Sequence, residues 1–173
     1  MIPVRARAGG IPGLGRVVAG IDPGLARTGY GFVAAEGERC RVLESGTIVT
    51  DAHLPDAERL QVLYAELLGR FRRLRPELVV VERLFFNRNA RSALSVGQAR
   101  GVALLAAARA GARVVEVSPQ QAKLAVSGQG AGTKEQVGFM VRALLKLQGS
   151  PGPDEADALA VALWGALGGG SLP

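Results

Sequence analysis

The hydrophobic positions of this chain first follow a strand-like pattern and then a helical one. Short apolar runs in RVVAGID (16–22), GYGFVAAEG (29–37) and CRVLESGTIVT (40–50) predict a meander of three strands, the first ended by Pro23 and Gly24. Apolar residues at helical spacing then predict an amphipathic helix over residues 56–74.

The rest of the pattern predicts two more strands and four more helices. ELVVVE (77–82) and ARVVEV (112–117) are expected to be buried strands, with a long alanine-rich helix over residues 90–110 between them. Further helices are expected at residues 119–126, 133–147 and 154–167. This order predicts an α/β fold in which helices flank both faces of a five-stranded mixed sheet.

The two ends of the chain do not share this periodicity. Residues 1–15 are rich in Gly, Pro and Arg, and we expect a flexible extension. Residues 16–167 are expected to form the folded domain, and residues 168–173 a frayed tail. GGIPGLG superficially resembles a dinucleotide-binding loop, but it precedes the first strand instead of following one, which argues against that function.

Composition adds that this is one globular domain. The chain has 173 residues, of which 48% are hydrophobic. No apolar run is long enough to cross a bilayer, and the N-terminus lacks the pattern of a secretory signal. A single cysteine, Cys40, allows no internal disulfide, so we expect a cytoplasmic protein without a membrane partner.

The formal net charge of +6 favours an anionic partner, and nucleic acid first. The excess is uneven, however, because Arg5, Arg7 and Arg16 all precede or begin the first strand. The remainder carries 18 basic and 15 acidic residues, so the positions of the basic groups are more informative than their number.

Four acids stand where predicted elements begin or end. Asp22 closes the first strand and Glu82 the fourth, while Asp154 and Asp157 share a face in the first turn of the last helix. Each acid could simply be solvated or cap a helix, the role expected for Glu155. If the first and fourth strands are neighbours, however, their acids converge, and the last helix can bring the other two acids to them.

Converged carboxylates would repel one another unless cations neutralised them. Oxygen ligands without a Cys or His cluster favour Mg²⁺ or Mn²⁺. Two such ions, about 3.5–4 Å apart, could activate a water and stabilise the leaving oxygen of a phosphodiester.

Four segments together resemble, in order and spacing, the RuvC family of Holliday-junction resolvases. They are GIDPGLARTGYGFV, VVVERLFFNRNARSALSVGQARG, SPQQAKLAVSGQGAGTKEQVGFMVRALLKL and DEADALAVALW. The resemblance implies an RNase H-like fold, a homodimer, and Mg²⁺-dependent paired nicking of four-way DNA junctions in recombination and repair. It also implies cooperation with the RuvA–RuvB branch-migration complex. In the matching motifs Asp22, Glu82, Asp154 and Asp157 take the catalytic, metal-binding positions.

Several cations are candidates for holding DNA. Among only three lysines against eighteen arginines, Lys123 and Lys134 match the family's functional lysines, and we interpret them as phosphate contacts. Arg88 and Arg91, with Arg83 and Arg100, could contact phosphates, although any of these six could equally be a solvated surface residue. The cluster Arg70, Arg72, Arg73 and Arg75 ends a helix and is interpreted as structural.

Two adjacent rings, Phe85 and Phe86, follow Glu82 in a polar stretch. Both could pack beneath the loop as a small satellite core. A ring can also stack on an unpaired base, which contributes about 1–3 kcal/mol, or wedge between base steps. The resemblance places Phe85 at the family's aromatic position near the junction centre, so Phe86 is expected to point inward.

Two other functions fit parts of the sequence. GIDPG followed by a hairpin also resembles the phosphate loop of actin-like ATPases and sugar kinases, but those proteins need two such domains and this chain is too short. A junction-binding module without catalysis is the second alternative, and the complete set of four acids argues against it.

Overall fold

The structure is a computed structural model that describes residues 13, 15–37, 39–83, 90–128 and 133–169. Its strands are β1 (Arg16–Asp22), β2 (Arg27–Glu36), β3 (Arg39–Val49), β4 (Leu78–Glu82) and β5 (Arg113–Val117). Its helices are α1 (Asp56–Leu74), α2 (Ala90–Arg109), α3 (Pro119–Ser127), α4 (Lys134–Leu145) and α5 (Pro153–Trp164). These bounds confirm the elements predicted from the sequence to within a few residues. The last helix differs most, because α5 ends at Trp164 and a short π-helix, Gly165–Gly169, follows it.

The five strands form one mixed sheet in the order β3-β2-β1-β4-β5. β1 is antiparallel to β2, and β2 to β3, which confirms the predicted meander. β4 runs parallel to both β1 and β5. The first and fourth strands are therefore neighbours, as convergence of their terminal acids requires.

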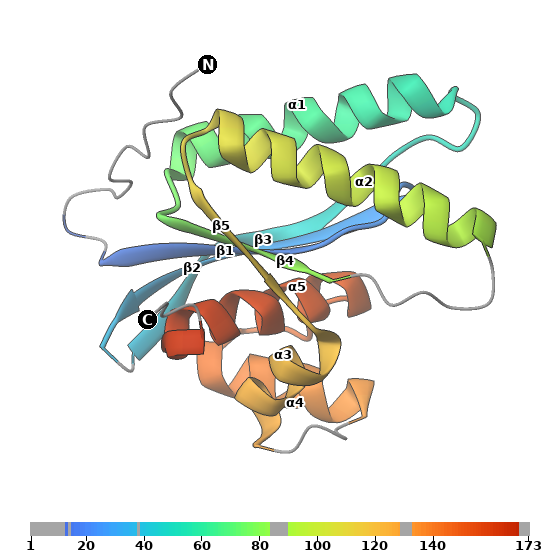
Figure 1. Cartoon of the computed structure of the whole chain (residues 1–173). Coiled ribbons are helices and arrows are strands. Elements are labelled where there is room, and N and C mark those ends of the chain that lie inside the picture. The colour runs from blue at the N-terminus through green and yellow to red at the C-terminus, as the bar shows by residue number, and fades with distance from the viewer. Residues whose placement is uncertain (1–12, 14, 38, 84–89, 129–132, 170–173) are drawn as a thin grey trace.

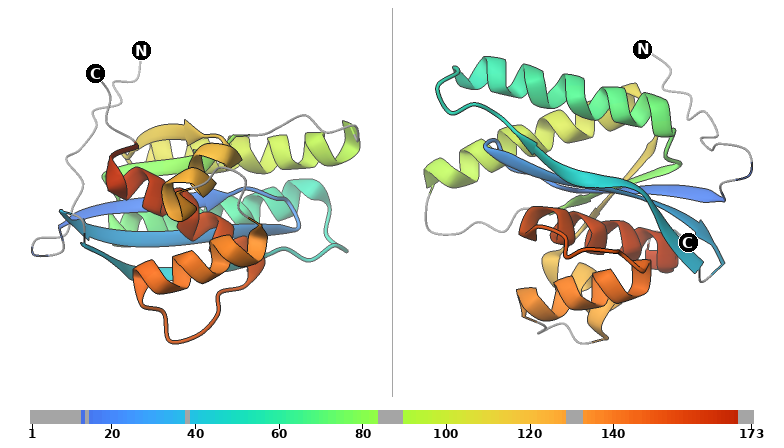
Figure 2. Two further views of the ribbon diagram at one scale, coloured as in Figure 1. Left: turned by 90° about the horizontal axis from the view of Figure 1, so that it is seen from below. Right: turned by 180° about the vertical axis from the view of Figure 1, so that it is seen from behind.

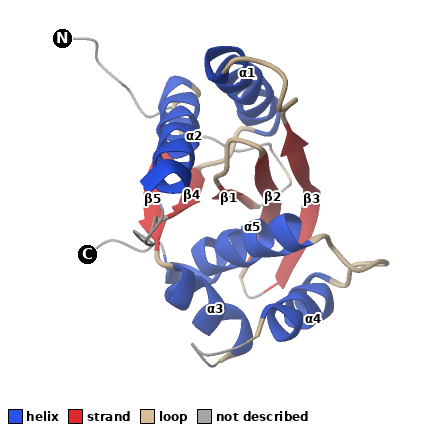
Figure 3. Cartoon of the chain, turned by 90° about the vertical axis from the view of Figure 1, so that its right-hand side faces the viewer, coloured by secondary structure: helices blue, strands red, loops and turns tan. Residues whose placement is uncertain are grey.

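Helices cover both faces of the sheet, as predicted. α1 and α2 lie on one face and α5 on the other, while α3 and α4 pack on the side of α5 that is turned away from the sheet (Figures 1 and 2). Figure 3, seen along the sheet, shows the same layers. No helix in the described ranges is both long and apolar enough to cross a membrane.

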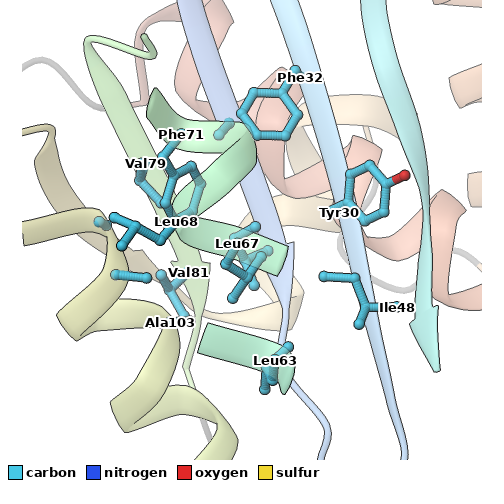
Figure 4. Packing of buried hydrophobic residues seen from close by; sticks show 14 of the residues in the cluster. Tyr30, Phe32, Ile48, Leu63, Leu67, Leu68, Phe71, Val79, Val81 and Ala103 are labelled. Carbon is cyan, nitrogen blue, oxygen red and sulfur yellow. The ribbon is translucent and has the colours of Figure 1, made fainter. Parts of the chain in front are cut away.

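The core between α1 and the sheet explains why the 56–74 pattern forms a helix. Its buried side chains, including Leu63, Leu67 and Phe71, recur at helical spacing and pack on strand residues such as Val79 (Figure 4). The ring of Phe71 meets that of Phe32 edge to face, with centroids 5.9 Å apart. This side of the sheet is a closed apolar layer that holds β1 and β4 in place.

On the opposite face, α5 approaches the sheet most closely where strand residues have no side chains. A Cβ atom on Gly20 would overlap the backbone of Ala158 and Ala162, and one on Gly29 would overlap the carbonyl of Asp154. Gly29 is also the residue that pairs with Asp22 across β1 and β2. The missing side chains therefore let the first turn of α5 lie directly beside the end of β1.

Candidate active site

Neighbouring strand ends place the first two acids side by side. Ile21 pairs with Val81 in the parallel β1–β4 ladder, so Asp22 and Glu82 follow as adjacent last residues of their strands. Both are half-buried. The valine run of β4 is buried throughout and ends at Glu82, which carries this carboxylate from the apolar interior to the edge of the sheet.

The first turn of α5 supplies the other two acids. Glu155 accepts a hydrogen bond from the backbone N–H of Gly152 at 3.2 Å, which confirms its predicted role at the helix start. Its other oxygen accepts a hydrogen bond of 2.6 Å from the hydroxyl of Ser45 in β3. Glu155 thus anchors the helix start to the sheet and leaves Asp154 and Asp157 for the site.

The pKa shifts of the two strand-end carboxyls indicate that they share one proton near neutral pH. Burial and the charge of Asp157 raise the pKa of Asp22 to about 6. Burial, and then the charge of Asp22, raise the pKa of Glu82 to about 8. A hydrogen bond between the two side chains lowers the pKa of Asp22 and raises that of Glu82, so Glu82 binds the proton more tightly than Asp22.

Two cations pair with the acids of α5. The Lys134 ammonium lies 3.2 Å from a carboxylate oxygen of Asp157, whose charge raises the pKa of Lys134. The Arg27 guanidinium donates a hydrogen bond of 2.6 Å to Asp154. Sequence reasoning singled out Lys134 but missed Arg27. The available signal was its position at the start of β2, five residues after Asp22 in the GIDPG motif.

The four acids form one electrostatic cluster. The charges of Asp154 and Asp157 both raise the pKa of Asp22, and Asp157 also raises that of Glu82. Across the described ranges, however, no group of three or more His, Cys, Asp or Glu side chains has the arrangement of a preformed metal site. In this conformation Arg27 and Lys134 pair with two of the acids, and the raised pKa values of Asp22 and Glu82 favour protonation of the other two.

The donor set nevertheless suits hard divalent cations. All four acids offer only carboxylate oxygens, which are the ligands that Mg²⁺ and Mn²⁺ prefer. Asp22 and Glu82 are crowded and partly desolvated, so a bound cation would replace the proton that they now share. Asp154 and Asp157 would exchange Arg27 and Lys134 for such an ion.

The structure describes only some of the other residues that were predicted to contact DNA. Lys123 lies half-buried on α3 and, within the described part of the chain, forms no ion pair with the four acids. Arg83 is exposed directly after Glu82. Arg100 instead pairs with Glu116 of β5. The predicted contacts Phe85, Phe86 and Arg88 lie outside the described residues, as does the side chain of Arg91.

Two of the four arginines at the end of α1 have the structural role that was predicted for the cluster. Arg70 and Arg73 both pair with Glu44 of β3, at 3.1 and 2.6 Å. The Arg70 guanidinium also lies over the ring of Tyr30, 4.5 Å from its centroid. These contacts tie α1 to the sheet on the face opposite α5.

Comparison with known proteins covers nearly the whole folded domain. Residues 18–164 match the family described as "Crossover junction endodeoxyribonuclease RuvC". The RuvC of Pelotomaculum thermopropionicum is 52% identical over 148 residues, which are 85% of this chain and 90% of that protein. The RuvC of Heliobacterium modesticaldum is 53% identical over an equal length, with 85% and 91% covered.

Solved structures give the same result. Thermus thermophilus RuvC superimposes with a TM-score of 0.80 at 43% identity, over 88% of this chain and 95% of that one. The same organism's RuvC in complex with a Holliday junction substrate gives 0.81 at 41% identity, over 88% and 94%. The yeast mitochondrial resolvase Ydc2, at 16% identity and a TM-score of 0.63, shares the fold.

Proposed function

This chain belongs to the RuvC family of crossover junction endodeoxyribonucleases, and we propose that it resolves four-way DNA junctions by paired symmetric nicks. It would act in recombination and DNA repair. One observation carries this proposal: the match to the family includes all four acids, which the fold gathers at the ends of β1 and β4 and the start of α5. The resemblance expected from the sequence motifs is confirmed, including the RNase H-like α/β fold.

We propose that Asp22, Glu82, Asp154 and Asp157 hold two divalent cations, Mg²⁺ first and Mn²⁺ as the alternative. Such ions stabilise the charge that develops on the attacking and leaving oxygens of a phosphodiester. The protein positions its four carboxylates from two strands and a helix that are packed against each other, so the ligands are held by the core and not by a loop.

The cations beside the acids have a second role in this proposal. The Lys134 side chain is 68% exposed, so its ammonium can bind a phosphate oxygen of DNA once an ion occupies Asp157. Arg27, whose side chain is 54% exposed, can do the same beside Asp154. Family resemblance adds Lys123 as a phosphate contact and Phe85 as the ring at the junction centre. Arg88 and Arg91 are proposed as further phosphate contacts from their positions after the fourth strand and on the long helix.

A homodimer would match the symmetry of the substrate. A two-fold dimer presents two identical sites to a four-way junction, so two opposed strands can be nicked symmetrically. The outward face of α2 supports this proposal, because Leu94 and Leu105 are 65% and 54% exposed and lie three helical turns apart on one side. The RuvA–RuvB complex remains a partner proposed from the family, and the cytoplasm the proposed location.

A paired assay tests the catalytic function against binding without catalysis. Nicking of a synthetic four-way junction is measured in Mg²⁺, and junction binding by gel shift in Ca²⁺. We expect Asp157→Asn to abolish nicking and to retain binding, because a metal ligand is lost while the DNA-binding surface stays. Asp56→Asn, an exposed acid in the first turn of α1, is the matched control and should nick normally. If Asp157→Asn nicks the junction normally, Asp157 is not a metal ligand. If the wild type binds the junction but does not nick it, the alternative of a junction-binding module without catalysis is favoured.

A further inference from the structure

A recess of about 360 Å³ opens next to the acid site, between α4 and the start of α5. One wall is α4, with Lys134, Gly138, Phe139 and Arg142. The other wall is the segment that enters α5, with Pro151 and Asp157. We call this hollow the α4 recess. Figure 3 shows α4 and α5 side by side, with α4 on the outer side.

The ring of Phe139 is exposed in this recess. It is 69% accessible, the largest fraction among the exposed large hydrophobic side chains of the described residues. A phenylalanine ring without a protein partner presents a π-face that any nucleic-acid base can cover. Single exposed apolar residues are ordinary on protein surfaces, so the location of this ring carries the argument and not its exposure alone.

The recess is continuous with the acid site. Asp157 and Lys134 belong to both, since they line the recess and form the ion pair beside Asp22 and Glu82. Arg142 lies eight residues beyond Lys134 on α4, which is about 12 Å along the helix axis. It is exposed, and no ion pair within the described ranges includes it. Lys134, Phe139 and Arg142 line the same hollow, so a DNA strand that runs through the recess from Lys134 to Arg142 has the ring of Phe139 beside it.

Glu135 and Gly138, which also line the α4 recess, are compatible with a DNA strand at this place. Glu135 lies in the first turn of α4, where hydrogen bonds from its own backbone and from Thr133 lower its pKa. The positive end of the helix dipole offsets that charge. At Gly138 an added Cβ would meet no protein atom within 4 Å, so open space lies above the helix backbone there.

We propose that the α4 recess receives the nucleotide next to the phosphodiester that is cut. Its base stacks on Phe139, and its outer phosphate contacts Arg142. This inference rests on the proposed nuclease function and names a binding subsite for it. Because stacking is tolerant of sequence, the recess contributes affinity and strand alignment more than base preference.

Substitution of the ring tests the stacking directly. Phe139→Ala should weaken junction binding in Ca²⁺ about tenfold, as expected for the loss of one stacked base, while Phe139→Tyr should bind like the wild type. Leu144→Ala, an exposed residue of α4 outside the recess lining, is the matched control and should leave binding unchanged. A junction with 2-aminopurine beside the cut site adds a local readout, since stacking on the ring quenches its fluorescence.

Filling the recess is the second test. Gly138→Leu should reduce binding and nicking without lowering Tm, because the added side chain enters open space in a helix. The inference would be overturned if Phe139→Ala and Gly138→Leu both bind the junction, quench 2-aminopurine fluorescence and nick like the wild type. The recess would then serve another partner, such as a protein. Absence of nicking in the wild-type protein would instead refute the proposed function, so the two failures are distinguishable.

Discussion

At the scale of single residues, the site is a set of four carboxylic acids. The proton and the cationic side chains that offset their charge can be replaced by other cations. Asp22 and Glu82 share a proton, and Asp154 and Asp157 pair with Arg27 and Lys134. Exposed ion pairs contribute little stability, about 0–1 kcal/mol, so Arg27 and Lys134 can leave their partners at small cost. In the proposed mechanism, divalent cations and DNA phosphates would therefore take their places without unfolding the site.

The shared proton predicts a pH dependence of stability in the metal-free protein. The pKa values of Asp22 and Glu82 rise from 3.8 and 4.5 in unperturbed groups to about 6 and about 8 on folding. Folding therefore favours their protonated forms, and the stability gained below the unperturbed values is lost as the pH rises through this range. We expect Glu82→Gln to have a higher Tm than the wild type in EDTA at about pH 8, with a smaller difference at about pH 4.

The exposed acid Glu77, just before β4, provides the control for this measurement, and Glu77→Gln should follow the wild type at both pH values. Mg²⁺ should raise the Tm of the wild type at about pH 8 more than that of Glu82→Gln, because a ligand that binds only the folded chain stabilises it. A Tm difference between Glu82→Gln and the wild type that does not change with pH would contradict the shared-proton interpretation.

At the scale of elements, the contact of α5 with the sheet sets the geometry of the site. Strand β1 brings Asp22 to the edge, and α5 reaches it only because Gly20 and Gly29 have no side chains. The buried alanines of α5 serve the same close approach from the helix side. Gly20, Gly29 and Gly31 of the GIDPGLARTGYG motif are thus required for packing against α5.

This packing predicts that Gly29→Ala harms both stability and nicking. The added methyl group would overlap the carbonyl of Asp154, so α5 must move away from β2. Overpacking of this kind costs about 1–3 kcal/mol, and the shift also displaces Asp154 and Asp157. Gly69→Ala in α1, where an added Cβ meets nothing, is the control and should be neutral or slightly stabilising. Thermal melts and the nicking assay measure both effects, and wild-type behaviour of Gly29→Ala would contradict the proposed packing.

At the scale of the whole molecule, the sheet separates two faces with different roles. The four acids and the α4 recess lie with α5 and α4 on one side. On the other side lie α1 and α2 (Figure 2), which cover the core that contains Leu63, Leu67 and Phe71. Leu94 and Leu105 of α2 are exposed. A dimer formed through α2 would therefore leave both catalytic faces open to DNA.

The proposed dimer predicts the effect of a charge on α2. Leu105→Glu places a carboxylate at a residue that is already 54% exposed in the single chain, so folding should be unaffected while association is lost. Sedimentation analysis should then show a dimer for the wild type and a monomer for the variant. Leu124→Glu, on α3 and 52% exposed, should remain dimeric. A dimeric Leu105→Glu protein would place the interface elsewhere.

The N-terminal extension predicts a separate effect on DNA affinity. Deletion of residues 1–15 removes Arg5 and Arg7 but none of the proposed site residues. Each phosphate contact contributes about 0.9 to the slope of log affinity against log salt, so the slope should flatten by up to about 2. Titration of junction binding with salt measures this change. Nicking should persist in the shortened protein, and its loss would show that the extension has a further role.

The sequence by itself determined the elements and the identity of the acids. Apolar spacing is a local property, so it predicted the strands and the 56–74 helix to within a few residues. The acids at the ends of β1 and β4 could be recognised because strand ends are marked by local changes in polarity. Glu155 could be assigned to the helix start for the same reason.

Only the tertiary structure decided which charges meet. Arg27 and Asp154 are 127 residues apart in the sequence, and Lys134 and Asp157 are 23 apart. The α4 recess likewise exists only where α4 lies against the start of α5. Such contacts depend on how closely α5 approaches the sheet, and that distance follows from the packing of Gly20 and Gly29 against a helix far along the chain. Periodicity reports which face of an element is buried, but not which distant element covers it.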